Sequence, residues 1–100
     1  MNKFCELLDL YLKNRHSEYE FKLDGQFVLG DEEIYVFYSE KLKKTLLLVS
    51  LEKRSRMKDM EEVRNYFEIN YKKKEGTLAF ALITFQCKFI FYDYNLTQKI

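Results

Sequence analysis

The spacing of apolar residues changes along this 100-residue chain, and each change predicts a different kind of element. The chain begins with an apolar stripe whose members recur at i, i+3, i+4, i+7 and i+8: Phe4, Leu7, Leu8, Tyr11 and Leu12. Residues with this spacing lie on one face of an α-helix. We therefore expect an amphipathic helix from about residue 3 to residue 15.

A second helical stripe lies in the middle of the chain, at Met60, Val63, Phe67 and Tyr71. Asp59 or Ser55 is the expected N-cap, because a short polar side chain can accept a hydrogen bond from a free N–H of the first turn. The lysines at 72–74 are expected at the C-terminal end, where positive charge is favourable, and Gly76 suits the end of the helix.

Short runs of aromatic and aliphatic residues predict strands in the rest of the chain. Tyr19, Phe21 and Leu23 alternate with polar residues, which is typical of a half-buried strand. Asp24-Gly25 then predicts either a hairpin turn or a bulge within one long strand. Further strands are expected at 34–38, 45–51, 77–85 and 88–94, the last two as a hairpin that turns near residues 85–87.

This order predicts an α+β fold with the succession helix, three strands, helix, two strands, in a single domain of residues 1–100. The expected sheet is antiparallel, with about five strands and two helices packed against it. The loops are too short for the crossovers that parallel pairing requires, except across the second helix.

Aromatic residues are frequent for a domain of this size. The chain has nine Phe, eight Tyr and no Pro. A small core does not need all of these rings, so we expect some of them in an interface with another protein. The second helix and the final strands have the largest surplus of apolar residues over what one side of a sheet can cover. The expected dimer interface therefore comprises Val63, Tyr66, Phe67, Tyr71 and Phe80.

Charge is divided unevenly along the chain. Residues 1–40 hold four basic and nine acidic residues, whereas residues 41–74 hold eleven basic and five acidic residues. Basic groups at 41–44, 53–56 and 72–74 are a possible nucleic-acid contact. Their separation from the strand aromatics favours solvated loops and a charged helix end. We therefore expect no nucleic-acid partner.

No group of residues predicts catalysis, a metal or a cofactor. His16 is the single histidine and is expected to be solvated near a helix end, with no nucleophile-elbow pattern elsewhere in the chain. Cys5 and Cys87 supply no closely spaced ligand pair. The acidic residues at 31–33 are typical of a solvated turn. We expect a binding protein and not an enzyme.

The expected location is the cytoplasm. No apolar run approaches the roughly 20 residues of a membrane helix, and the first residues lack the apolar stretch of a signal peptide. Two cysteines far apart in sequence are expected to be free thiols in a reducing compartment.

Three passages resemble the small chaperones that serve effector proteins in bacterial type III secretion systems. They are the opening helix with Leu7-Leu8 before Leu23-Asp24-Gly25, the strand at 45–51, and the passage from Asn70-Tyr71 to Gly76-Thr77-Leu78. The last is the most specific, because it resembles the family's transition from helix to strand. The family is typically acidic, whereas this chain has a net charge of +1.

The resemblance implies an ATP-independent homodimer, or a heterodimer with a related small chaperone. Such chaperones bind an extended, unfolded segment of an effector in surface grooves and keep it soluble for export. The expected cargo-binding residues, each also a candidate for plain core, are Leu8, Leu12, Phe21, Phe27 and Leu29. Two alternatives stay open: a small nucleic-acid-associated regulatory protein using residues 41–74, and an immunity or antitoxin protein that binds one toxin.

Overall fold

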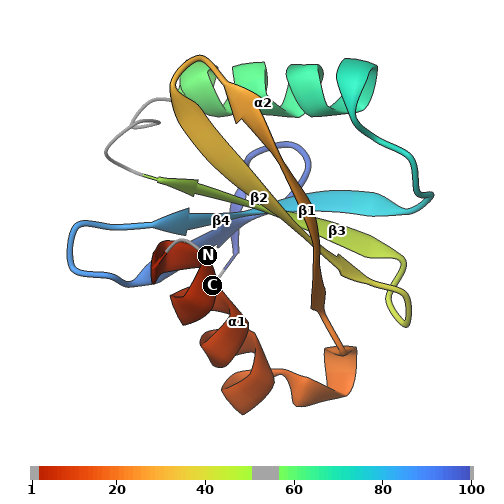
Figure 1. The fold of residues 1–100 in the computed structure, drawn as a ribbon, viewed down its shortest axis with the longest axis vertical. Coiled ribbons are helices and arrows are strands. Elements are labelled where there is room, and N and C mark those ends of the chain that lie inside the picture. The colour runs from red at the N-terminus through yellow and green to blue at the C-terminus, as the bar shows by residue number, and fades with distance from the viewer. Residues whose placement is uncertain (1–2, 51–56, 100) are drawn as a thin grey trace.

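The computed structural model describes residues 3–50 and 57–99, which form a mixed sheet with one helix on each face (Figure 1). The elements are α1 (Lys3–Arg15), the 3-10 turn η1 (Ser17–Tyr19), β1 (Lys22–Leu29), β2 (Glu32–Ser39), β3 (Lys44–Ser50), α2 (Met57–Asn70), β4 (Thr77–Ile83), β5 (Phe89–Tyr92) and β6 (Gln98–Lys99). The α+β class and both predicted helices are confirmed. Of the two candidate N-caps, Asp59 lies inside the first turn of α2 and is therefore not the N-cap, and Ser55 lies outside the described residues. Gly76, which was expected at the end of this helix, instead directly precedes β4.

The strands lie in the sheet in the order of the chain, from β1 to β6. Every neighbouring pair is antiparallel except β3 and β4, which run parallel from Lys44 opposite Thr77 to Ser50 opposite Ile83. The sheet is thus mostly antiparallel, as predicted, and the parallel pair lies across the second helix, where the sequence left parallel pairing open. The connection that contains α2 is long enough to return the chain to the same end of the sheet, so β4 enters in the direction of β3. The two-residue strand β6 was not predicted.

β1 is one bulged strand and not a hairpin. Its ladder with β2 shifts register between Leu23 and Gly25, so Asp24 is the extra residue of the bulge. A Cβ atom at Gly25 would lie 2.2 Å from the hydroxyl oxygen of Tyr71. Tyr71, which follows α2, approaches the backbone of β1 at the bulge, so a larger residue at position 25 would have to displace the Tyr71 hydroxyl.

Each face of the sheet has its own buried cluster. The α2 face buries Phe27, Ile34, Val36, Leu47, Val49, Met60, Val63, Phe67, Leu78, Phe80, Leu82 and Leu96. The α1 face buries Cys5, Leu8, Leu12, Phe21, Tyr35, Phe37, Leu46, Leu48, Ala81 and Ile83. Successive side chains of a strand point to opposite faces. This explains the bulky residue at every position from 34 to 38, since both faces are covered.

Candidate functional site: an apolar groove beside α1

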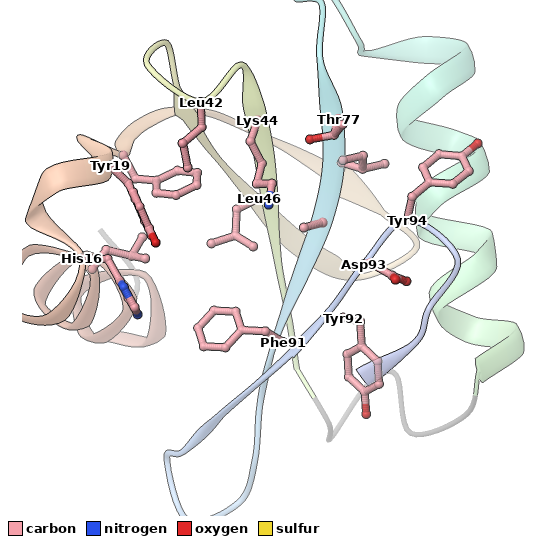
Figure 2. Close-up of a pocket in the computed structure, with 14 residues that line it drawn as sticks. His16, Tyr19, Leu42, Lys44, Leu46, Thr77, Phe91, Tyr92, Asp93 and Tyr94 are labelled. Atoms are coloured by element: carbon pink, nitrogen blue, oxygen red, sulfur yellow. The ribbon is translucent and has the colours of Figure 1, made fainter. Parts of the chain in front are cut away.

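An open apolar groove of about 390 Å³ lies beside the C-terminal end of α1, bounded by η1, the β2–β3 turn and the ends of β3, β4 and β5 (Figure 2). We call it the α1 groove. Its lining residues are Leu12, His16, Tyr19, Phe21, Leu42, Lys44, Leu46, Thr77, Leu78, Ala79, Phe91, Tyr92, Asp93 and Tyr94. Most of them are aliphatic or aromatic, so the groove suits apolar side chains.

One side of the groove is formed by a part of β4 that β5 does not reach. The β4–β5 ladder begins with Phe80 opposite Tyr92, so Thr77, Leu78 and Ala79 extend past the end of β5. The Thr77 N–H donates a hydrogen bond to the carbonyl oxygen of Lys43, the residue before β3, at a distance of 3.0 Å. Backbone polar groups alternate between the two sides of a strand, so the N–H and C=O of Leu78 point to the side that β5 has left.

Aromatic rings form the wall nearest α1. The His16 ring stacks on Tyr19, with centroids 5.3 Å apart and planes 5° apart. Tyr11 of α1 contacts both His16 and Phe91, with centroids 5.8 and 5.7 Å away. His16 is therefore half-buried in this wall, which differs from the solvated position that the sequence predicted.

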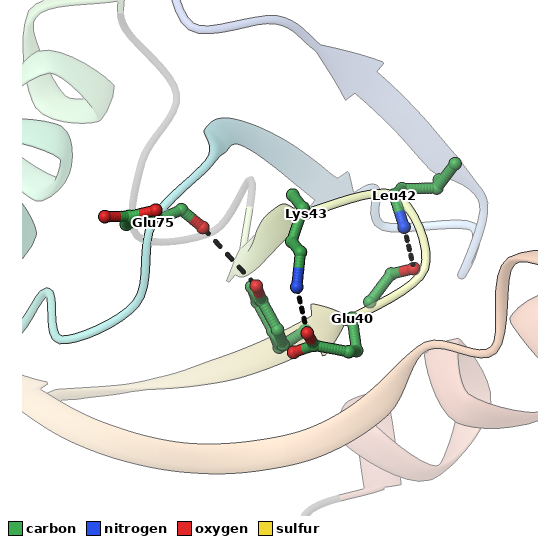
Figure 3. A network of polar contacts seen from close by, with 6 residues as sticks. Glu40, Leu42, Lys43 and Glu75 are labelled. Atoms are coloured by element: carbon green, nitrogen blue, oxygen red, sulfur yellow. Dashed lines mark hydrogen bonds and ion pairs between the residues drawn. The ribbon is translucent and has the colours of Figure 1, made fainter.

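Ser39, the last residue of β2, ties two walls of the groove together. Its side chain has no exposed surface. The hydroxyl donates to the Tyr19 carbonyl at 2.5 Å and accepts from the Leu42 N–H at 3.0 Å. In the same turn Lys43 pairs with Glu40 and lowers the pKa of that carboxyl by hydrogen bonding to it (Figure 3). These bonds fix Tyr19 and Leu42 relative to each other at the groove.

The opposite wall is the connection between β5 and β6, which is held in two ways. The Asp93 carboxylate accepts hydrogen bonds from the N–H groups of Asn95 and Thr97, at 3.0 and 2.9 Å. Tyr94 is bound to α2: its hydroxyl donates to Glu68 at 2.6 Å, and its carbonyl accepts from Arg64 at 2.9 Å. The hydrogen bond to Glu68 raises the pKa of Tyr94.

The predicted cargo-binding residues are divided between the groove and the two cores. Leu12 and Phe21 line the α1 groove, although they are only 5% and 9% exposed. Leu8 is buried under α1, whereas Phe27 is buried on the α2 face and Leu29 packs against the same cluster. The structure therefore does not bring the five together, because β1 directs Phe27 and Leu29 to the other face. Their role in binding stays a prediction.

The predicted dimer residues belong to the α2-face core. Val63, Phe67 and Phe80 are between 0% and 3% exposed, and Tyr66 and Tyr71 pack partly buried against that cluster. The apolar surplus that suggested an interface is thus covered within one chain, because the sheet has two covered faces. These side chains give no support to dimerisation, and the dimer stays a prediction.

Two residues that shape the groove, Ser39 and Leu42, were not singled out from the sequence. Both lie in a connection that is otherwise charged, which is typical of a solvated turn. A weak signal was present, because a serine hydroxyl often accepts a nearby backbone N–H at the start of a turn. Leu42 was a second signal, as an isolated apolar residue among charged ones; it is 40% exposed.

The structure also bears on the basic groups, on metal binding and on membrane-spanning helices. Lys43 pairs with Glu40 in the basic segment, and Lys74 pairs with Asp24 at 2.7 Å. The basic group at 53–56 lies outside the described residues. Within residues 3–50 and 57–99, no group of three or more His, Cys, Asp or Glu side chains is placed to hold a metal ion. In that same part of the chain, no helix is both long and apolar enough to cross a membrane.

Comparison with known proteins identifies no family: no protein-family model matches the chain, and no curated protein matches it significantly. The groove and its surroundings are therefore the basis for inferring a function.

Proposed function

We propose that this protein is a cytoplasmic chaperone that binds an extended, unfolded segment of a secreted effector protein and keeps it soluble for export without ATP. The observation that carries the proposal is the α1 groove. Tyr19, Leu42 and Tyr94 at the groove are 36%, 40% and 40% exposed, yet hydrogen bonds hold their backbone or side chains in place. Exposed apolar side chains held around a hollow are typical of a protein-binding surface.

The succession of elements is a second support. The resemblance to type III secretion chaperones implies helix, three strands, helix, two strands and usually a last helix. The first seven of these elements occur in that order, with η1 and β6 in addition, whereas the described residues contain no helix after β5. The most specific passage of the resemblance joins the end of α2 to the start of β4. Within it, Tyr71 contacts the bulge at Gly25, and Leu78 lies at the α1 groove.

Backbone pairing would add affinity to the apolar contacts. The N–H and C=O of Leu78 point to the open side of β4, next to the groove. An extended segment that lies there can continue the sheet past the end of β5, with its alternate side chains directed into the groove. This mode of binding needs no nucleotide.

The chaperone is proposed to act as a homodimer or as a heterodimer with a related small chaperone. Within the part of the chain that the structure describes, β1 is an edge strand of the sheet, and its residues Leu23 and Val28 are 42% and 55% exposed. A free edge with exposed apolar side chains is a possible site of pairing between chains. Sedimentation tests the proposal, since a homodimer has twice the 12.2 kDa mass of the chain. A 12.2 kDa species at every concentration, without a related partner, would contradict it.

The test of cargo binding compares two exposed aliphatic side chains. Leu42→Ser alters the α1 groove, whereas Ile69→Ser alters the outer side of α2, where Ile69 is 80% exposed. The cargo is the N-terminal segment of a secreted protein encoded beside this chain. Because Leu42 has 40% of its surface left to bury, its loss should cost about 0.6–1.2 kcal/mol, or about three- to eight-fold in affinity.

Binding is measured by calorimetry with and without ATP, and the state of the bound segment by NMR of the isotope-labelled segment. We expect narrow amide dispersion in the bound segment, equal affinity with and without ATP, and weaker binding by Leu42→Ser alone. A cargo that stays folded in the complex would point to the immunity or antitoxin alternative. Equal binding by both variants would exclude the groove as the contact.

A further inference from the structure

A second hollow, of about 470 Å³, lies between the outer side of α1 and the β4–β5 turn. We call it the outer hollow. α1 contributes Leu7, Leu10 and Arg15 to it, and the turn and β5 contribute Lys88 and Phe89. Leu10 is 56% exposed, so this hollow also presents an apolar side chain to a partner.

Tyr11 joins the outer hollow to the α1 groove. Its ring packs on Phe89, which lines the outer hollow, and on Phe91, which lines the α1 groove, at centroid distances of 5.4 and 5.7 Å. The centroids of Phe89 and Phe91 are 6.4 Å apart. Alternate side chains of an extended chain are spaced by about 6.8 Å. An extended segment lying along β5 can therefore place side chains two residues apart on either side of Tyr11.

The charged groups along this path are mostly positive. Lys44 lines the α1 groove, and Arg15 and Lys88 line the outer hollow. None of the three has an ion-pair partner among the described residues. The guanidinium of Arg15 lies over the ring of Tyr11, 5.5 Å from its centroid, and is thus held at the junction of the two hollows.

Among the described residues that line the two hollows there is one acid, and it does not offset these cations. It is Asp93, whose Oδ1 already accepts the N–H groups of Asn95 and Thr97. On α1, Asp9 pairs with Lys13 at 2.8 Å and lines neither hollow. A bound segment therefore meets apolar surface flanked by cations that have no carboxylate of their own.

We infer that the bound segment is acidic: an extended stretch with apolar side chains at alternate positions and carboxylates between or beside them, which meet Lys44, Arg15 and Lys88. This inference rests on the proposed function and specifies the chemistry of its cargo. A guanidinium and two ammonium groups recognise carboxylates by charge-assisted hydrogen bonds. Several rings at the two hollows pack on one another, His16 on Tyr19 and Tyr11 on Phe89 and Phe91. This packing leaves fewer ring faces for the base stacking that a nucleic acid would need, and so favours a polypeptide.

The test uses three unstructured synthetic peptides of equal length with the same apolar residues at alternate positions. The residues between them are Glu in the first peptide, Gln in the second and Lys in the third. Fluorescence anisotropy measures their binding to the full chain at low and at physiological salt. We expect the Glu peptide to bind about two- to ten-fold more tightly than the Gln peptide, and the Lys peptide to bind most weakly. This preference should shrink as salt is added.

The variant Arg15→Gln/Lys88→Gln keeps Lys44, so it should have a smaller preference for the Glu peptide and should bind the Gln peptide as the unaltered chain does. Lys13→Gln is the matched control, because Lys13 is a cation of the same helix outside both hollows, and it should keep the preference. Equal binding of the Glu and Gln peptides, or an unchanged preference in the double variant, would overturn the inference but leave the proposed function standing. If none of the peptides binds, both the inference and the proposed function fail.

The same experiment would also detect two other possible occupants of the two hollows, a nucleic acid and a second copy of the chain. Displacement of the Glu peptide by a single-stranded oligonucleotide, with a steep dependence on salt, would show a nucleic-acid site and overturn the inference. Self-association of the chain that disappears in Arg15→Gln/Lys88→Gln would show that a second copy occupies this face, and would overturn it as well.

Discussion

At the scale of single residues, Ser39 has the strongest influence on the shape of the α1 groove. Its hydroxyl is fully buried and bonded in both directions, to the Tyr19 carbonyl and from the Leu42 N–H. These two partners belong to η1 and to the β2–β3 turn, which are distant from each other in sequence. A buried hydroxyl is retained at low cost when it makes both bonds, because each bond replaces one lost to water. The serine thus positions two exposed groove residues without being exposed itself.

Ser39→Ala should lower the free energy of unfolding by about 1–2 kcal/mol, because it removes two hydrogen bonds and leaves two backbone groups without that partner. It should also weaken cargo binding, since Tyr19 and Leu42 are no longer held together. Ser17→Ala is the control, because Ser17 is an exposed serine of η1. Urea unfolding and calorimetry measure the two effects. Stability and binding that match those of Ser17→Ala would show that the Ser39 bonds are unimportant.

The two cysteines should differ in reactivity and in their dependence on pH. Burial raises the pKa of Cys5 above its ordinary value of 9.0, and the nearby carboxylate of Asp9 raises it further. As pH rises, the unfolded chain therefore ionises this thiol before the folded chain does. The stability that depends on the protonated thiol is present below pH 9 and is lost as pH rises from there through the higher folded pKa.

Two measurements check this prediction. A thiol reagent should modify exposed Cys87 rapidly in the folded protein and Cys5 only on unfolding. The alkaline loss of stability should also be smaller in Cys5→Ala than in the unaltered chain, and this comparison removes the contribution of lysines and tyrosines. Equal labelling rates for the two thiols would refute the buried position of Cys5.

At the scale of elements, the entry into β4 depends on a glycine. Gly76 has a φ of 120°, and a Cβ atom there would lie 1.9 Å from the Lys43 carbonyl oxygen. Gly76→Ala should lower stability by about 2–4 kcal/mol, because both backbone strain and the close approach oppose the methyl group. Gly30→Ala is the matched control: its φ is 65°, with no atom within 4 Å, and it should cost about 1 kcal/mol. Equal urea midpoints for the two variants would contradict the close approach.

The sequence was sufficient for most of the elements but not for their partners in space. It missed β6, and it placed Tyr19 in a strand although this residue ends the 3-10 turn η1. The helical stripe from Phe4 to Leu12 and the run of bulky residues from Ile34 to Tyr38 were enough to place α1 and β2, because periodicity depends only on which side of an element is buried. It does not say how many faces of the sheet are covered. For that reason Val63 and Phe80 were interpreted as interface residues when they are core.

The groove was only partly predictable for a similar reason. Leu12 and Phe21 could be proposed because they belong to recognisable elements. The open stretch at Leu78 depends on where β5 ends relative to β4, and the position of Leu42 depends on the hydrogen bonds of Ser39. Both are tertiary facts that involve residues distant in sequence, and local pattern contains no information about them.

At the scale of the whole molecule, the two faces of one sheet contribute side chains to two separate hydrophobic cores. The described residues have a Cα radius of gyration of 12.3 Å, close to the about 13 Å expected for a compact domain of 100 residues. β2 directs Ile34 and Val36 to the α2 face and Tyr35 and Phe37 to the α1 face. A helix can leave its face only by exposing strand residues whose neighbours support the other core. The two halves are therefore expected to unfold together.

The last prediction tests this coupling with one large ring from each core. Phe37 on the α1 face and Phe80 on the α2 face are both fully buried. Phe37→Ala and Phe80→Ala should each cost about 3–5 kcal/mol, a large part of the about 5–15 kcal/mol that stabilises a typical domain. Because the sheet is shared, far-UV circular dichroism and tyrosine fluorescence should report a single, coincident urea transition for both variants. If Phe37→Ala instead loses α1 in a first transition while the α2 face stays packed, the two cores are independent. The α1 groove would then be bordered by a helix that can detach without unfolding the rest of the protein.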